Sequence, residues 1–256
     1  MLARIGEPDH RCTGLRTNLV ITITSVRRDL RQHGLVLKSA AGFGGAALAG
    51  YIAGTLPSAD LAAGIKARRD GSRPADLRVA GTGNPGGLNA ARVLGTRWGL
   101  GVMVADFVKG TLSCIAGRRL AGQDGAYVAG TAAVIGHCLP LWNGFRGGKG
   151  VATSAGTALV CFPPYTPIDT TVAAALVRLS RGDANFAVVA ASSAFTLASL
   201  VWWRWRLPNL WGPRPSWGLP AYAAATSAVI AWRMVAGGSP TASAPDASLQ
   251  LTGVNV

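Results

Sequence analysis

Long blocks without charged residues constrain this chain more than any other feature. Hydrophobic residues make up 49% of the 256 positions and charged residues only 14%, and the charges gather in short segments between apolar stretches. A helix of ~20 apolar residues spans the hydrocarbon core of a bilayer. The sequence therefore predicts an all-α, polytopic membrane helix bundle of about seven transmembrane helices rather than a soluble domain.

Five spans follow directly from the apolar runs. They are expected at about 37–58, 98–117, 125–143, 184–203 and 219–235. The stretch 151–177 is too short for two ordinary spans, which need ~20 residues each. It is also broken at Pro163-Pro164, so we expect either two short helices or one interrupted span there.

Lys and Arg set the expected orientation, because basic loops between spans stay on the cytoplasmic side of a membrane. With seven spans, the basic loop 66–97 and the loop 144–150 fall on one side, which we assign to the cytoplasm. The Arg-rich segment 1–34 then lies on the other side, against this rule. Either that segment is not part of the natural product or the topology has an extra element. We expect 1–34 and the tail 237–256 to be disordered, with 35–236 forming the membrane domain.

The formal net charge of +14 raises nucleic acid as a partner. The basic clusters are separated by long apolar stretches, however, and no nucleic-acid-binding motif is visible. Membrane lipid and phosphorylated substrates account for the basicity better. The cysteines show neither paired nor metal-type spacing, so we expect no disulfide framework and no metal site. They are Cys12, Cys114, Cys138 and Cys161.

Two glycine-rich loops each combine a freely rotating backbone with a fixed positive charge. The segment 81–92 reads GTGNPGGLNAAR, and the segment 145–153 reads FRGGKGVAT. Glycine allows successive N–H groups to point into one concavity, which binds anions. Arg92 would add a bidentate fork for phosphate and Lys149 a compact point charge. Because two spans separate the loops, both face the same compartment and can share one site.

Two nucleotide-binding patterns are matched only in part. The spacing of Gly81, Gly83 and Gly86 fits the dinucleotide fingerprint, but Pro85 stands where the helix should begin and no strand–helix–strand unit surrounds it. Gly148-Lys149 resembles a phosphate-binding P-loop. There Asn143 replaces the first glycine and Gly150 replaces the hydroxyl residue that holds magnesium. We therefore expect no cofactor.

Three ionisable residues fall inside the apolar runs. Asp106 and Lys109 lie three apart on one face of the second span, where charges are costly unless they are paired or face a polar interior. They form either a structural ion pair or part of the site. His137, near the end of the third span, is either a hydrogen-bonded structural group or a site residue facing the same polar interior.

Taken together, these motifs resemble the bacterial acyl-phosphate-dependent glycerol-3-phosphate acyltransferases. The likeness covers about 45–236 and rests on 81–92, Asp-x-x-Lys-Gly at 106–110, Gly-His at 136–137 and 145–153. It implies a seven-helix enzyme of the bacterial inner membrane with its motifs on the cytoplasmic side. Such an enzyme transfers a fatty acyl group from acyl phosphate to the 1-hydroxyl of glycerol 3-phosphate, giving lysophosphatidate for phospholipid biosynthesis.

The resemblance also assigns roles residue by residue. It implies three catalytic residues, which are Thr82, Arg92 and Lys149. It implies a set of substrate-binding residues in and near the two loops, which are Gly83, Asn84, Gly86, Asn89, His137, Gly147, Gly148 and Gly150. Thr82 stands where the family has a serine, and Leu88 replaces the family's threonine.

A larger departure concerns the motif that ends the last helix of the family. Residues 233–237 fit its second half, but Ser227 and Ile230 stand where His and Asn belong, and Ser239 where Glu belongs. The alternative is therefore a non-catalytic membrane protein of the same fold that binds phosphate esters or phospholipid.

Overall fold

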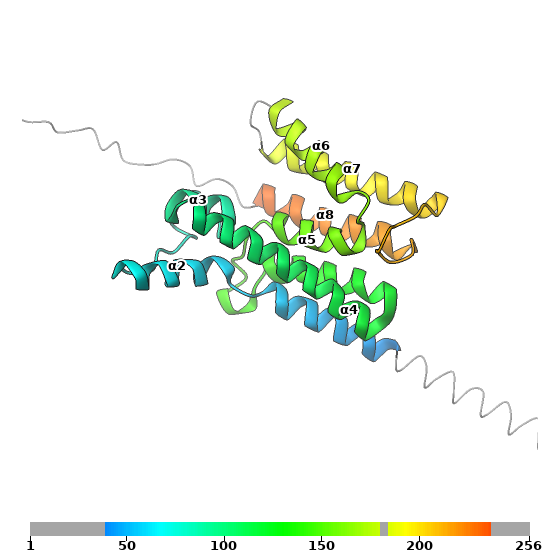
Figure 1. Cartoon of the computed structure of the whole chain (residues 1–256), viewed down its shortest axis with the longest axis horizontal. Helices are drawn as coiled ribbons and strands as arrows, with labels where there is room; N and C mark the ends of the chain where they lie inside the picture. The colour runs from blue at the N-terminus through cyan, green and yellow to red at the C-terminus, as the bar shows by residue number, and fades with distance from the viewer. Residues whose placement is uncertain (1–38, 180–183, 237–256) are drawn as a thin grey trace, which may run out of the picture.

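The computed structural model describes residues 39–179 and 184–236, and within these all regular secondary structure is helical (Figure 1). A first helix covers residues 39–54. It is followed by α2 (Ser58–Asp70), α3 (Gly87–Leu94), α4 (Thr96–Cys138), the short 3-10 helix η1 (Leu141–Asn143), α5 (Val151–Cys161), α6 (Thr166–Leu179), α7 (Ala184–Trp205) and α8 (Gly218–Ala236). The expectations for 1–34 and 237–256 lie outside the described residues.

Helix α4 is a hairpin of two antiparallel halves. Its backbone leaves helical geometry at Ala121 and at Gly122, where φ is 70° and ψ is −159°. The left-handed φ favours glycine, which has no Cβ to clash. Close to this turn the halves meet at Gly117 and Gly125, where a Cβ on either residue would overlap the carbonyl oxygen of the other. The predicted spans 98–117 and 125–143 thus correspond to the two halves of α4, but the second half ends at Cys138, so the predicted span 125–143 is five residues too long.

The first helix packs closely on the second half of α4. A Cβ on Gly54 would overlap the carbonyl oxygen of Ala133, and one turn earlier the same holds for Gly50 and Ala129. Small residues allow helix backbones to approach each other in membranes, where van der Waals contact replaces the hydrophobic effect between helices. The helix ends before Pro57, so the predicted span 37–58 is a few residues too long.

Residues 151–177 form two short helices, which is the first of the two predicted alternatives. Helix α5 ends at Cys161 because Pro163 and Pro164 have no N–H to donate to the carbonyls of the preceding turn. Two side chains from the α7–α8 connection satisfy carbonyls at this end. Trp211 Nε1 donates to Leu159 O at 2.9 Å, and Asn209 Nδ2 donates to Cys161 O at 3.0 Å.

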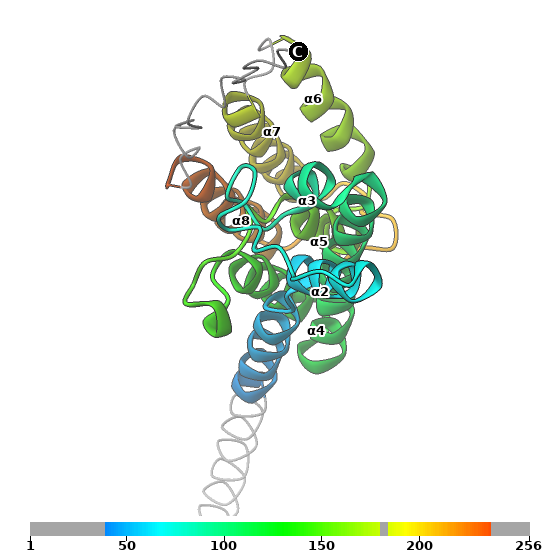
Figure 2. The same ribbon diagram turned by 90° about the vertical axis from the view of Figure 1, so that its left-hand side faces the viewer.

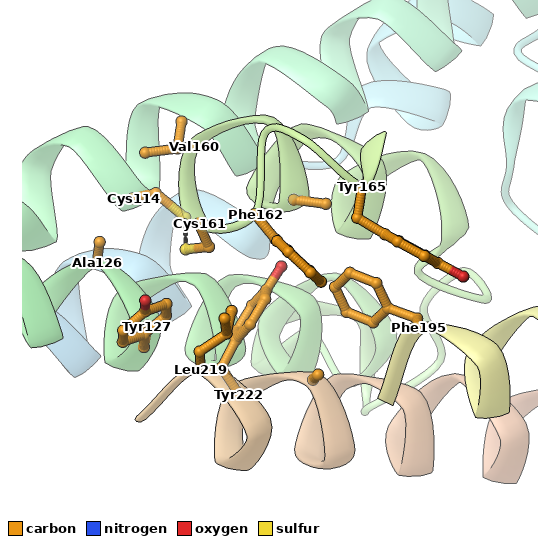
Figure 3. Close-up of a cluster of buried hydrophobic side chains, with 12 residues drawn as sticks. Cys114, Ala126, Tyr127, Val160, Cys161, Phe162, Tyr165, Phe195, Leu219 and Tyr222 are labelled. Atoms are coloured by element: carbon orange, nitrogen blue, oxygen red, sulfur yellow. Dashed lines mark hydrogen bonds between the residues drawn. The ribbon is translucent and has the colours of Figure 1, made fainter. Parts of the chain in front are cut away.

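An aromatic core fills the space between α4, α5, α7 and α8 (Figure 3). Phe162 stacks on Tyr165 with ring centroids 5.3 Å apart, and Phe195 of α7 packs against both rings. The hydroxyl groups of Tyr222 and Thr157 lie 2.6 Å apart, so the buried phenol of α8 has a polar partner on α5. This core fixes α8 against α5.

Seven helical segments make up the described bundle when the halves of α4 are counted separately. By length and composition, the stretches Thr96–Asn143 and Phe186–Trp205 are apolar enough to cross a membrane, and Val151–Cys161 is a shorter apolar helix. The predicted loop 66–97 is wrong in part, because the end of α2 and all of α3 lie within it. These two helices pack beside the start of α4 rather than extending the bundle (Figure 1).

Candidate anion-binding site at one end of the bundle

The two glycine loops meet at the end of the bundle that carries α2, α3 and η1 (Figure 2). Arg78, which stands just before the first loop, makes a bidentate ion pair with Asp60 of α2 at 2.7 and 2.9 Å. Its Nε also donates to the carbonyl of Arg146 in the second loop at 3.0 Å. The hydrogen bond with Asp60 raises the pKa of Arg78. Through its bond to Arg146, 68 positions later in the sequence, Arg78 ties the segment before the first loop to the second loop.

Asn89 organises the first loop from below. Its side chain is buried, and its Oδ1 accepts from the Thr82 N–H at 2.8 Å. Its Nδ2 donates to the carbonyls of Leu77 and Ala80 at 3.0 and 2.9 Å. The amide is therefore fully used within the protein. Its place in the structure is that of a residue that positions the loop, and direct contact with substrate stays a prediction.

The predicted concavity of glycine N–H groups is wrong for much of the first loop. Gly83 N donates to Ala80 O at 3.2 Å and Gly86 N donates to Asn84 O at 2.8 Å, so both amides point into the loop itself. The N–H groups without a capping side chain lie just after this loop segment, in the first turn of α3. Gly86 is its N-cap and provides no side-chain cap, which leaves the first-turn N–H groups available for an anion.

The second loop is clamped from both sides. Gly147 N donates to Cys138 O at 3.2 Å and Gly148 N to His137 O at 3.1 Å, which uses the two amides expected to bind substrate. From the other side, Arg233 of α8 donates to the carbonyls of these same residues, with Nη2–Gly147 O at 2.6 Å and Nε–Gly148 O at 3.3 Å. A Cβ on Gly148 would overlap His137 Nε2. Packing on His137 is what requires glycine here.

Lys149 and the start of α5 supply the anion-binding groups that the glycine amides do not. Gly150 is the N-cap of α5, with a left-handed φ of 85° and no side-chain cap. Uncapped first-turn N–H groups and the helix dipole together favour an anion at this position. Lys149 is half-buried, and burial and then the nearby charge of Arg233 lower its pKa. A phosphate group here would offset both effects.

The loops line one small cavity, as expected for segments on the same side of a membrane. Pro85 of the first loop and Gly147 and Gly148 of the second contribute to its wall. Its volume is about 20 Å³, room for about one water molecule, so substrates would have to bind above it. Thr82 is half-buried and Arg92 is exposed in the last turn of α3. Neither of them lines this cavity, and Lys149 does not line it either. Within the described part of the chain, Arg92 and Lys149 make no direct contact with each other.

The buried ionisable residues form the floor of the cavity. Lys109 Nζ lies 2.9 Å from Asp106 Oδ1 and also donates to Leu56 O at 3.0 Å. His137 Nδ1 approaches the same carboxylate oxygen at 3.5 Å. All three side chains line the cavity. Asp106 and Lys109 were expected to form either a structural ion pair or part of the site. They are an ion pair buried between helices, and the same pair lines the cavity floor.

Sequence reasoning did not place Arg78, Asp60 or Arg233 in the site. The partners of Arg233 are backbone carbonyls, which no side-chain pattern reveals. Two signals were available: Arg233 matches the second half of the family's last-helix motif, and it stands at the end of an apolar helix next to Trp232, whose ring lies 5.7 Å from its guanidinium carbon. Two positions of α8 depart from the family motif. Of these, Ser227 Oγ donates to Ser192 O of α7 at 3.1 Å, while Ile230 is buried against Val134 and Cys138.

The fold and the site together define an integral membrane helix bundle with two uncapped helix starts at one end, suited to phosphate groups, the second of them directly after Lys149. The profile of the family Glycerol-3-phosphate acyltransferase matches residues 45–237. The chain belongs to this family, an enzyme family of phospholipid biosynthesis.

Named relatives and solved structures agree with this assignment. A glycerol-3-phosphate acyltransferase of Thermoanaerobacter pseudethanolicus is 34% identical over 132 residues, which is 52% of this chain and 66% of the relative, just under two thirds of its length. Glycerol-3-phosphate acyltransferase 1 of Dehalococcoides mccartyi is 38% identical over 61% of this chain and 74% of its own. The crystal structure of PlsY (YgiH), an integral membrane glycerol 3-phosphate acyltransferase in its glycerol 3-phosphate form, superposes with a TM-score of 0.59 at 27% identity. That match covers 76% of this chain and 94% of PlsY.

Proposed function

We propose that this chain transfers a fatty acyl group from acyl phosphate to the 1-hydroxyl of glycerol 3-phosphate, giving lysophosphatidate and inorganic phosphate. The observation that carries the proposal is the clamped second loop. Arg233 and the end of α4 hold its glycines, and this directs Lys149 and the uncapped start of α5 toward one anion. A solved relative is described as a glycerol 3-phosphate form, which supports this acceptor.

The reaction needs no nucleophile from the protein, because the acyl group is already activated by phosphate. The 1-hydroxyl oxygen attacks the acyl carbonyl carbon, the bond from that carbon to the phosphate oxygen breaks, and the hydroxyl proton passes to a phosphate oxygen. The protein must bring two anions together and stabilise charge that develops at the carbonyl oxygen. Lys149 with the α5 start would hold one phosphate, and Arg92, Thr82 and the α3 start would hold the other.

The same proposal places the chain in the bacterial inner membrane with both loops on the cytoplasmic side. The concentration of Lys and Arg in the 66–97 segment supports this orientation. Ser72 is exposed between α2 and α3, so in a Cys12→Ser background a cysteine introduced there should react with a membrane-impermeant maleimide only after the cell membrane is opened. Labelling of intact spheroplasts would reverse the orientation.

Acyl transfer is tested by incubating the purified protein with palmitoyl phosphate and labelled glycerol 3-phosphate and separating lysophosphatidate. Palmitoyl coenzyme A in place of palmitoyl phosphate tests the donor. Lys149→Ala should abolish most product, whereas Lys66→Ala should not, because Lys66 is paired with Asp70 on the exposed face of α2. A folded protein that binds glycerol 3-phosphate but forms no lysophosphatidate with either donor would establish the non-catalytic alternative.

A further inference from the structure

A second cavity lies at the other end of the bundle and shares no lining residue with the first. It is a groove of about 570 Å³ between the first half of α4 and the end of α5. Ile115, Leu159 and Val160 form most of its apolar wall, and Arg118, Arg119 and Trp211 form its rim. The α7–α8 connection, which carries Trp211, lies at this end, opposite α2 and α3 (Figure 1).

The rim is held in place by defined hydrogen bonds. Arg118 Nη1 donates to the carbonyl of Trp211 at 2.9 Å, and the Trp211 indole N–H donates to Leu159 O at 2.9 Å. In a continuous helix that carbonyl would accept from residue 163, which is proline and has no N–H. The indole therefore completes the end of α5 and is fixed by it. Its ring still remains 59% exposed, so the groove has a rigid aromatic edge.

The rim lies at the depth of lipid headgroups. From Thr96 to Arg119 the first half of α4 has 24 positions, about 36 Å at 1.5 Å per residue, enough to cross a hydrocarbon core of about 30 Å. Arg118 and Arg119 are exposed at its end. No partner is recorded for Arg119 among residues 39–179 and 184–236. The groove thus has an apolar wall inside the bilayer and two adjacent arginines at the bilayer surface. This arrangement complements a molecule with an acyl chain and an anionic headgroup.

We propose that this groove binds an anionic glycerophospholipid from the leaflet at the end of the bundle away from the glycine loops. Its phosphate lies between Arg118 and Arg119, and one acyl chain follows Ile115, Leu159 and Val160. A free phosphate ion would leave the apolar wall uncovered, and a zwitterionic lipid would gain less from the two arginines. The site is separate from acyl transfer and does not depend on it.

The test is native mass spectrometry of the full-length protein from nanodiscs with equal phosphatidylglycerol and phosphatidylcholine. The wild type should retain phosphatidylglycerol. Arg119→Gln should weaken this retention about fivefold, and the double variant Arg118→Gln/Arg119→Gln about 25-fold, at about 1 kcal/mol per basic residue near a membrane surface. Arg204→Gln is the matched control, because Arg204 is exposed at the end of α7 but does not line the groove.

Arg119→Gln keeps the test interpretable if loss of the Arg118–Trp211 bond distorts the groove. Phosphatidylglycerol with brominated chains should also quench the fluorescence of the wild type more than that of Trp211→Phe. Equal retention of phosphatidylcholine, or wild-type retention by both variants, would overturn the proposal. So would displacement of the brominated lipid by palmitoyl phosphate, which would assign the groove to the acyl donor, or a lipid-free dimer, which would assign it to a second copy.

Discussion

Arg233→Lys should separate the geometry of the second loop from its charge. The guanidinium forks across two successive carbonyls, with Nη2–Gly147 O at 2.6 Å and Nε–Gly148 O at 3.3 Å. A lysine ammonium keeps the positive charge near Lys149 and can remain near the Trp232 ring. It cannot hold both carbonyls in a fixed plane. The substitution therefore loosens one side of the clamp and leaves the local electrostatics nearly unchanged.

The expected magnitude follows from the weaker of the two bonds. Hydrogen bonds to charged groups contribute about 1.5–3 kcal/mol each, and the bond to Gly148 at 3.3 Å is long, so its loss belongs at the lower end. About 1.5 kcal/mol corresponds to about a tenfold change in an equilibrium constant. If the ordered loop directs Lys149 and the α5 start at glycerol 3-phosphate, the KM for this substrate should rise about tenfold. The KM for palmitoyl phosphate should change much less.

The assay is steady-state lysophosphatidate formation with each substrate varied in turn, together with a thermal melt of the purified variant. Arg204→Lys provides the control, since Arg204 is an exposed arginine of α7 with no recorded loop contact. The reasoning is refuted if both KM values stay at the wild-type level. It is equally refuted if kcat falls and both KM values rise together with a lower Tm, because that pattern indicates general unfolding rather than a misplaced acceptor loop.

Further substitutions probe the remaining elements of the site. Arg92→Lys should reduce kcat/KM at least tenfold, because an ammonium cannot replace a bidentate fork on phosphate; wild-type turnover would remove that role. Gly148→Ala should raise the KM for glycerol 3-phosphate more than that for acyl phosphate, because the added Cβ overlaps His137 Nε2 and must shift the loop. Asn89→Ala removes the side-chain partner of the Thr82 N–H and of the carbonyls of Leu77 and Ala80, of which only Ala80 O keeps another bond, from Gly83 N; the change should cost about 1–3 kcal/mol, measured as a lower Tm. Burial lowers the pKa of Lys149, so its charge is present below that pKa and is lost above it. As the pH is raised, the KM for glycerol 3-phosphate should therefore begin to increase at a lower pH than it would with a lysine of ordinary pKa. The check is the Lys149→Arg variant, whose KM should not show this increase.

The arrangement of spans was predictable because apolar length is a local property of the sequence. The break at Pro163-Pro164 could be placed for the same reason, since proline removes a backbone donor wherever it stands. The hairpin in α4 was predictable from the polar residues between two apolar runs. Helices α2 and α3 were missed because they lie in a basic segment between apolar runs and, at 13 and 8 residues, are too short for a span.

The site was predictable in its residues but only partly in its geometry. Glycine-rich composition indicated an anion-binding backbone, yet it could not show that the amides of Gly147 and Gly148 pair with the end of α4. Their partners are the carbonyls of Cys138 and His137, 9 and 11 positions earlier, and this pairing depends on how the connection from α4 to α5 folds back rather than on composition. The same limit hid the Asp60–Arg78 pair, whose partners are 18 positions apart in sequence.

The position of α8 gives a physical meaning to the half-motif that this chain retains. Arg233 contacts the backbone of the second loop directly, whereas Ser227 bonds to α7 and Ile230 packs beside Gly150. A Cβ on Gly150 would lie 3.5 Å from Ile230 Cγ1. Of the two positions that depart from the family motif, residue 230 is therefore the one that borders the loop. Isoleucine at this position provides no hydrogen-bonding group beside the loop but leaves the clamp and the uncapped α5 start in place. Under the proposed function, recognition of phosphate then rests on Lys149, Arg92 and the two helix starts. For that reason, loss of the Arg233 fork should be felt more strongly here than in a relative that has an additional polar group at position 230.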